Sequence, residues 1–82
     1  MKKLSGKLLA QTVVSIRKEK GMTQAQLAEA TGINRAMLSR LESEDYVPSV
    51  EQMQALGDIL GFEPVDMFIE ESGRKNVKGI IL

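Results

Sequence analysis

Two arginines and a set of short polar side chains lie close together between residues 34 and 43. Arg35 and Arg40 carry the strongest hydrogen-bonding chemistry of this stretch, because a guanidinium holds its donors in a planar fork that can reach O6 and N7 of a guanine. If Leu38 and Leu41 point inward on a helix, the opposite face consists of Ala36, Ser39, Arg40 and Ser43, with Arg35 at its edge. This pattern favours a helix that reads base edges. For each arginine, a solvated surface charge or a phosphate contact is the alternative.

Caps and glycines predict the two helices that would position this face. Thr23 is a favourable N-cap, and Gln26 three residues later completes a capping box, so one helix begins directly after Thr23. Gly32 ends it, because glycine adopts the left-handed conformation of a tight turn without steric cost. Asn34 caps the next helix. Two short helices joined by a turn with glycine, over residues 24–43, are typical of a helix-turn-helix.

Two further helices are predicted on either side of this pair. The first runs from about residue 7 to residue 20, and its buried stripe consists of Leu9, Val13 and Ile16. A helix capped by Ser49 and Gln52 follows the pair, with Val50, Met53, Leu56 and Leu60 facing inward. Gly57 inside that helix is expected to let a neighbouring helix approach closely.

The two ends of the chain have weaker patterns. Pro64 suits the first position of a fifth helix, which would extend to about Glu71 and present Val65, Phe68 and Ile69. Residues 1–6 are polar and are expected to be frayed. Residues 76–82 are expected to form a short strand or a loose tail. The predicted fold is all-α, with five helices around one core.

Composition limits the classes of protein that this chain could represent. Eighty-two residues are enough for one small domain. No cysteine is present, which indicates a cytoplasmic protein, and no apolar run approaches the length of a membrane span. The absence of both His and Cys removes the usual general bases, nucleophiles and transition-metal ligands, so we expect neither an enzyme nor a metal or cofactor site.

The charges are separated along the chain although the net charge is zero. Residues 1–40 contain eight basic and two acidic groups, residues 41–71 contain nine acidic groups and no Lys or Arg, and residues 72–82 add three basic groups. A positive region opposite a negative one would orient a small protein on a polyanion. The separation supports a nucleic-acid partner but would not establish one alone.

The spacing within the predicted pair resembles that of the Cro/lambda-repressor-type, or XRE-like, helix-turn-helix regulators. Within the twenty residues QAQLAEATGINRAMLSRLES, six positions are filled as in that family: Leu27, Ala28, Gly32, Ile33, Leu38 and Leu41. The resemblance covers about Leu9 to Phe68. It implies a five-helix, lambda-repressor-like DNA-binding domain over residues 1–72, followed by a C-terminal tail over residues 73–82.

The resemblance also implies roles for individual residues. The recognition helix, at about 35–43, would enter the major groove of double-stranded DNA. The expected base contacts are Arg35, Ala36, Ser39 and Arg40, and the expected phosphate contacts are Thr23, Gln24, Asn34 and Ser43. For Asn34, capping alone is nearly as good an explanation. Arg17 and Glu42 match the positions of a structural ion pair between the first and third helices.

One departure from the family lies just after Glu42. The family usually has a glycine there and then basic residues that touch phosphate, whereas this chain has Glu44 and Asp45. Without the glycine, the recognition helix is expected to run on or to end differently. The two carboxylates would also repel a nearby phosphate.

The function predicted from these observations is a sequence-specific transcriptional regulator, a repressor that binds a palindromic operator as a homodimer. The spare apolar residues Phe68 and Ile69, with the tail, are the predicted dimer surface, although Phe68 and Ile69 could instead complete the monomer core. The alternative is an antitoxin that binds a toxin protein and represses its own promoter.

Overall fold

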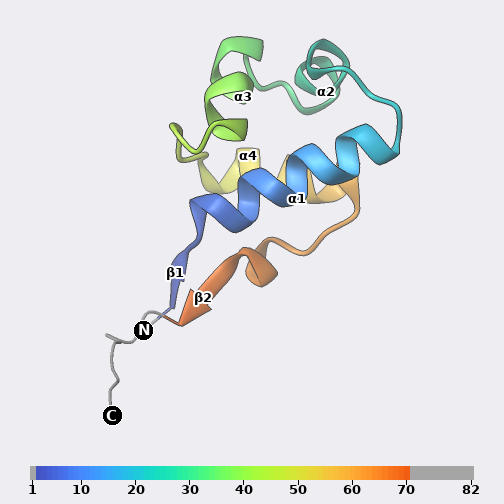
Figure 1. Ribbon diagram of the computed structural model, residues 1–82. Coiled ribbons are helices and arrows are strands. Elements are labelled where there is room, and N and C mark those ends of the chain that lie inside the picture. The colour runs from blue at the N-terminus through green and yellow to red at the C-terminus, as the bar shows by residue number, and fades with distance from the viewer. Residues whose placement is uncertain (1, 71–82) are drawn as a thin grey trace.

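The computed structural model describes residues 2–70. In order, the elements are β1 (Lys2–Leu4), α1 (Gly6–Glu19), α2 (Gln24–Thr31), α3 (Arg35–Glu42), α4 (Val50–Leu60), a 3-10 turn η1 (Pro64–Met67) and β2 (Phe68–Glu70). Figure 1 shows α2 and α3 together at one end of the molecule, the two strands at the other end, and α1 and α4 between them. No helix within residues 2–70 has the length and hydropathy needed to cross a membrane.

The local signals for helix ends act as predicted. Thr23 Oγ1 accepts from the backbone N–H of Gln26 at 3.0 Å, and Gln26 Oε1 accepts from the N–H of Thr23 at 2.9 Å. Ser49 and Gln52 form the same reciprocal box at the start of α4. Gly32 ends α2 with a φ of 76°, the left-handed conformation expected there. Side chains within four residues of each other are therefore enough to set these boundaries.

One buried cluster joins all four helices. It contains Leu9, Val13, Leu27, Ala28, Ile33, Leu38, Leu41, Met53, Leu56, Leu60 and Met67. Most residues predicted to face inward lie in this cluster, and Ile16 packs against it while remaining partly exposed. Val50 was predicted to face inward but is 84% exposed. It is the first residue of α4 and precedes the part of the helix that packs against the core.

The predicted fifth helix is wrong, and so is the predicted frayed start of the chain. After Pro64 the chain makes only one 3-10 turn, and Phe68 is already extended, with φ −99° and ψ 131°. β2 pairs antiparallel with β1, with Lys3 opposite Ile69, and Ser5 N–H donates to the Met67 carbonyl at 2.9 Å. Backbone hydrogen bonds between residues 2–5 and residues 67–70 thus take the place of the helical hydrogen bonds predicted after Pro64. The predicted tail lies outside the described residues.

Gly57 is required by a close approach, but not of a neighbouring helix. A Cβ at Gly57 would lie 2.6 Å from the carbonyl oxygen of Phe62 and 3.1 Å from Cδ of Pro64. Both atoms belong to the segment that follows α4, which folds back over the last turns of its own helix. The absent side chain lets that segment deliver η1 and β2 to their places.

Candidate nucleic-acid interface

The α3 helix turns its apolar side chains inward and leaves its polar face uncovered. Leu38 and Leu41 are 0% and 1% exposed, and α3 packs against both α1 and α2. The four predicted base-contacting residues, Arg35, Ala36, Ser39 and Arg40, are all exposed. The structure therefore brings these four together on one accessible face.

Asn34 fixes the start of this helix. Its Oδ1 accepts from the backbone N–H groups of Ala36 at 2.8 Å and of Met37 at 3.4 Å. The amide nitrogen takes part in none of these bonds, so the side chain can cap α3 and still offer a donor to a phosphate. Capping and phosphate contact are compatible in this geometry.

Arg17 and Glu42 lie beneath the face, where the structure joins α1 to α3. Arg17 Nε donates to Glu42 Oε2 at 2.8 Å, and Arg17 Nη2 donates to Glu42 Oε1 at 3.1 Å. The side chains are 11% and 7% exposed. Arg17 Nη1 donates to the Met22 carbonyl at 2.8 Å, so the guanidinium also holds the loop before α2.

Gln24 belongs to the same network, which sequence reasoning missed. Its Nε2 donates to Glu42 Oε1 at 2.8 Å. Gln24 and Glu42 are 18 residues apart and lie on different helices, so no local pattern indicated the contact. Glu42 thereby ties the start of α2 to the end of α3, and the side chain predicted to clamp a phosphate is held in place from below.

The start of α2 offers backbone donors as well as the Thr23 hydroxyl, which accepts from Gln26 N–H and keeps its own proton to donate. The capping box uses the N–H and the hydroxyl oxygen of Thr23, and Leu27 N–H donates to its carbonyl. The N–H groups of Gln24 and Ala25 are the first two of the helix and have no intrahelical acceptor. These two groups, with the helix dipole, favour an anion at this end of α2.

The helix α3 ends as a glycine would end it, contrary to the expectation that it would run on or end differently. Glu44 takes the left-handed conformation, with φ 63°. Glu44 N–H donates to the Leu41 carbonyl at 3.0 Å and Asp45 N–H to the Arg40 carbonyl at 2.7 Å, which is a Schellman motif. Ser43 is the C-cap, exposed, with its N–H directed to the carbonyls of Ser39 and Arg40. The turn therefore has the geometry that a glycine usually supplies, with an acidic residue at the left-handed position.

Asp45 also contacts the exposed face of α3 directly. Its Oδ2 lies 3.4 Å from Nε of Arg40, and both side chains are largely exposed. No sequence argument predicted this pair, although its signal was present: the two residues occupy the positions that a Schellman motif brings together.

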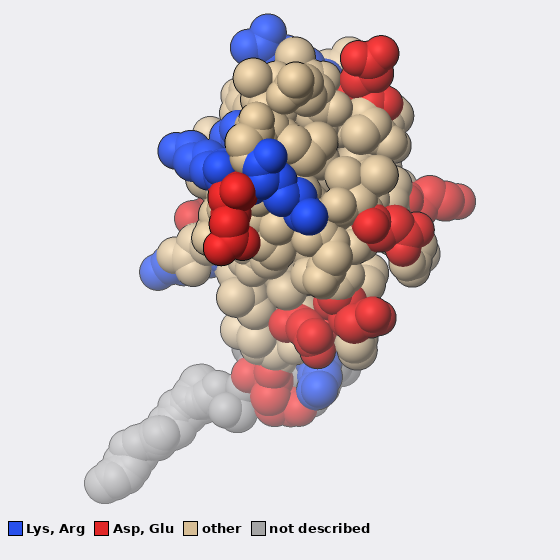
Figure 2. All heavy atoms as spheres, turned by 90° about the vertical axis from the view of Figure 1, so that its right-hand side faces the viewer, with Lys and Arg blue, Asp and Glu red and all other residues tan. Residues whose placement is uncertain are grey.

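Charge is unevenly distributed on the surface. In Figure 2, blue side chains gather mainly in the upper left of the molecule, while red side chains spread over its right and lower parts. The upper part carries α2 and α3 (Figure 1). The charges are only partly separated in space, because Arg40 lies beside Asp45 and Lys2 lies opposite Glu70 in the strand pair.

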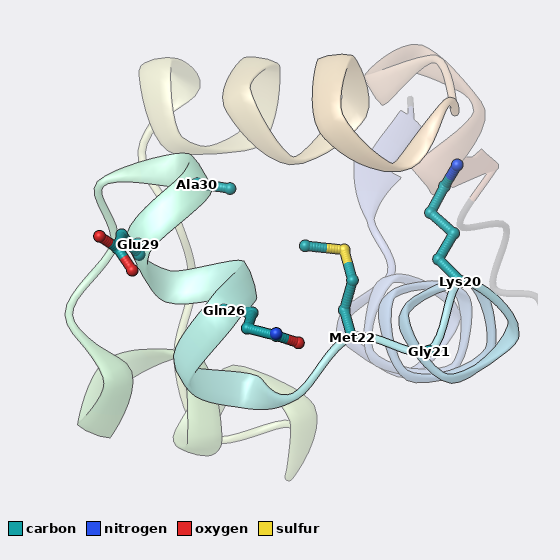
Figure 3. Close-up of a pocket in the computed structure, with 6 residues that line it drawn as sticks. All are labelled: Lys20, Gly21, Met22, Gln26, Glu29 and Ala30. Carbon is teal, nitrogen blue, oxygen red and sulfur yellow. The ribbon is translucent and has the colours of Figure 1, made fainter.

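An open hollow lies beside the interface, between the end of α1 and the outer side of α2 (Figure 3). Its volume is about 500 Å³, and it is lined by Lys20, Gly21, Met22, Gln26, Glu29 and Ala30. None of the predicted base- or phosphate-contacting residues lines it. Within residues 2–70, no cluster of His, Cys, Asp and Glu side chains could hold a metal ion.

Two short capped helices that present an exposed polar face above a tripartite Arg17–Glu42–Gln24 network define a DNA-binding helix-turn-helix domain. The helix-turn-helix family model HTH_3 matches residues 14–67, and the chain belongs to that family of transcription regulators.

Relatives of this chain include a repressor and further regulators. It is 34% identical over 64 residues to an immunity repressor protein of Bacillus phage phi105, a match that covers 78% of this chain but 44% of the repressor. It is 41% identical over 61 residues to an uncharacterized HTH-type transcriptional regulator of Methanothermobacter thermautotrophicus, covering 72% of this chain and 88% of that protein.

Solved structures agree on the fold. The restriction-modification controller protein C.AhdI from Aeromonas hydrophila superposes with a TM-score of 0.68 at 25% identity, covering 77% of this chain and 96% of that one. The clp gene regulator ClgR from Corynebacterium glutamicum gives a TM-score of 0.67 at 31% identity, covering 76% of this chain and 66% of that one.

Proposed function

We propose that this protein is a transcriptional repressor that binds a two-fold symmetric operator as a homodimer and reads it with α3. The observation that carries the proposal is the exposed face of α3, where Arg35, Ala36, Ser39 and Arg40 lie opposite a fully buried apolar stripe. Arginine forks are suited to guanine, and the small Ala36 permits close approach to a base edge. The phage protein named above, a relative of this chain, is an immunity repressor, which supports the proposal of a repressor.

The phosphate contacts proposed for this interface surround the base-reading face. The first N–H groups of α2, the Thr23 and Ser43 hydroxyls and the Asn34 amide would bind the DNA backbone, and Gln24 would do so while held by Glu42. Such contacts set the register of the protein on the duplex without reading sequence. The base-reading residues then determine which register is bound most tightly.

Dimerisation is proposed because one domain buries too little DNA for strong discrimination, whereas a two-fold dimer doubles every contact. The proposed surface includes β2, where Phe68 is 38% and Ile69 is 49% exposed on opposite faces of the strand. The exposure of Ile69 supports a place on a dimer surface rather than in the monomer core. Phe68 also borders an apolar cavity of about 320 Å³, lined by Leu4, Val47, Pro48, Ser49, Val50, Met53, Gln54 and Pro64.

The test is to select bound duplexes from a random-sequence library and to titrate salt on the best one. We expect a preferred duplex with two inverted half-sites, bound more tightly than a scrambled duplex of equal length. The logarithm of the binding constant should fall with the logarithm of salt by about 0.9 per phosphate neutralised, with ~3–5 phosphates per subunit. A selected duplex that binds no better than the scrambled one at low salt would overturn the proposal.

The antitoxin alternative stays a prediction. No contact within residues 2–70 favours it, and the relatives named above are regulators and a repressor.

A further inference from the structure

The turn that ends α3 places an acidic side chain beside a base-reading arginine. In a Schellman motif, the residue after the left-handed one lies next to the side chain one turn back in the helix, and this contact is usually apolar. Here the left-handed residue is Glu44, and the two neighbouring positions are Asp45 and Arg40. The 2.7 Å backbone bond from Asp45 N–H to the Arg40 carbonyl fixes this placement. The charged pair is thus a consequence of backbone geometry.

The contact engages one particular atom of the guanidinium. Asp45 Oδ2 lies 3.4 Å from Arg40 Nε, the nitrogen nearest the backbone. The two terminal nitrogens of Arg40 therefore remain free to donate, and these are the atoms that can form an end-on fork with O6 and N7 of guanine. The side chains are 61% and 75% exposed, so the pair contributes little to the stability of the fold.

We propose that Asp45 is a positioning residue for DNA recognition: it holds Arg40 through Nε so that the terminal nitrogens face one guanine. The inference rests on the proposed function of α3 as the reading helix. Ordering a long, flexible side chain before binding removes part of the entropy cost of the base contact.

The same carboxylate also reduces attraction to DNA of any sequence. Asp45 and Glu44 lie at the C-terminal end of α3, where both oppose the helix dipole and would repel any phosphate that comes near. A residue that weakens non-specific binding while orienting a base-reading side chain raises the ratio of specific to non-specific affinity. That ratio, rather than the affinity alone, determines whether a regulator finds its site among competing sequences.

The experiment compares Asp45→Ala, Asp45→Asn and Glu44→Gln on the duplex selected from a random-sequence library. The base pair read by Arg40 is identified first. It is the base pair whose replacement weakens DNA binding by the wild-type protein but not by the Arg40→Ala variant. Discrimination is then the ratio of the Kd for the duplex with that base pair replaced to the Kd for the selected duplex.

We expect Asp45→Ala to lower discrimination at that base pair by about 3- to 10-fold while binding to a scrambled duplex tightens. Asp45→Asn keeps an oxygen that accepts from Nε, so discrimination should return to nearly the wild-type value. Glu44→Gln is the matched control, because it removes a charge from the same turn without touching Arg40. Binding to the selected duplex and to the duplex with the base pair replaced should therefore tighten by the same factor. Thermal unfolding should remain close to wild type in all three variants, because the pair is exposed.

Two results would overturn the inference. One is that Asp45→Ala tightens binding to the selected duplex and to the duplex with the base pair replaced by the same factor, as Glu44→Gln does. Asp45 would then act only as a repelling charge. The other is that Asp45→Asn loses as much discrimination as Asp45→Ala. Failure of the proposed function looks different, because then no duplex is preferred by the wild-type protein.

Discussion

Arg17 and Glu42 are 25 residues apart in the sequence, yet the guanidinium of one meets both carboxylate oxygens of the other. The pair lies almost entirely out of solvent and has two further bonds, from Arg17 to the Met22 carbonyl and from Gln24 to Glu42. Three helices are thereby joined beneath the exposed polar face of α3 at a single carboxylate. A change at this carboxylate should therefore weaken the packing of α3 against both α1 and α2.

Replacing Glu42 with Ala should lower the free energy of unfolding by about 3 kcal/mol, because Arg17 is left buried without its partner. Denaturant unfolding measures the effect. Glu29→Ala, which removes an exposed carboxylate from α2, is the control and should change stability by less than about 0.5 kcal/mol. Equal stability of the two variants would show that the pair does not hold the helices together.

Arg35→Ala and Arg40→Ala should each lose about 1–3 kcal/mol of binding free energy on the preferred duplex and less on a random one, because a lost base contact lowers specificity. Kd values on matched duplexes at one salt concentration provide the measurement. If binding to the preferred duplex and to the random duplex weakens equally, the two arginines contact phosphates rather than bases.

Glu44→Gly should stabilise the fold by about 1 kcal/mol, because glycine adopts the left-handed conformation of residue 44 without steric cost. Glu44→Lys removes the same negative charge but retains the strain, so in high salt, where its interaction with the helix dipole is screened, its unfolding midpoint should stay near wild type. The lysine should tighten binding to all DNA sequences together, since it attracts phosphate. Equal unfolding midpoints for the glycine and lysine variants would argue against strain at this position.

Gly57→Ala should destabilise the protein by about 1–3 kcal/mol although alanine is the better helix former, because its Cβ would collide with the carbonyl of Phe62. Gly6→Ala is the matched control, since nothing lies within 4 Å of a Cβ there. That variant should be neutral or slightly stabilising. Thermal unfolding of the pair tests the prediction, and a stabilised Gly57→Ala would contradict the close approach of the segment after α4.

Ile69→Glu should weaken the proposed dimer and, with it, binding to the two-half-site duplex. Glutamate at position 69 would face Lys3 across the strand pair, so the β1–β2 pairing should survive. Ile59→Glu alters an isoleucine of comparable exposure on α4 and should leave the association unchanged. Sedimentation equilibrium measures the dimer, and identical dissociation constants for both variants would exclude β2 from the interface.

The sequence alone determined the features that depend on near neighbours in the chain. Thr23 and Gln26 are three residues apart and define the start of α2, and Gly32 defines its end. The spacing of Leu38 and Leu41 decides which face of α3 is buried, and hence that Arg35 and Arg40 are exposed. These features follow from helical periodicity and backbone conformation, which act over one or two turns.

Tertiary structure alone decided the contacts between distant parts of the chain. A strand at residues 2–4 forms only because residues 68–70 satisfy its backbone groups, and neither segment carries a local signal for the pairing. The bond from Gln24 to Glu42 likewise depends on how α2 and α3 cross. At Glu44, local propensity disfavoured the left-handed turn. The hydrogen bonds that close the end of α3 outweigh the cost of about 1 kcal/mol of placing a side chain there.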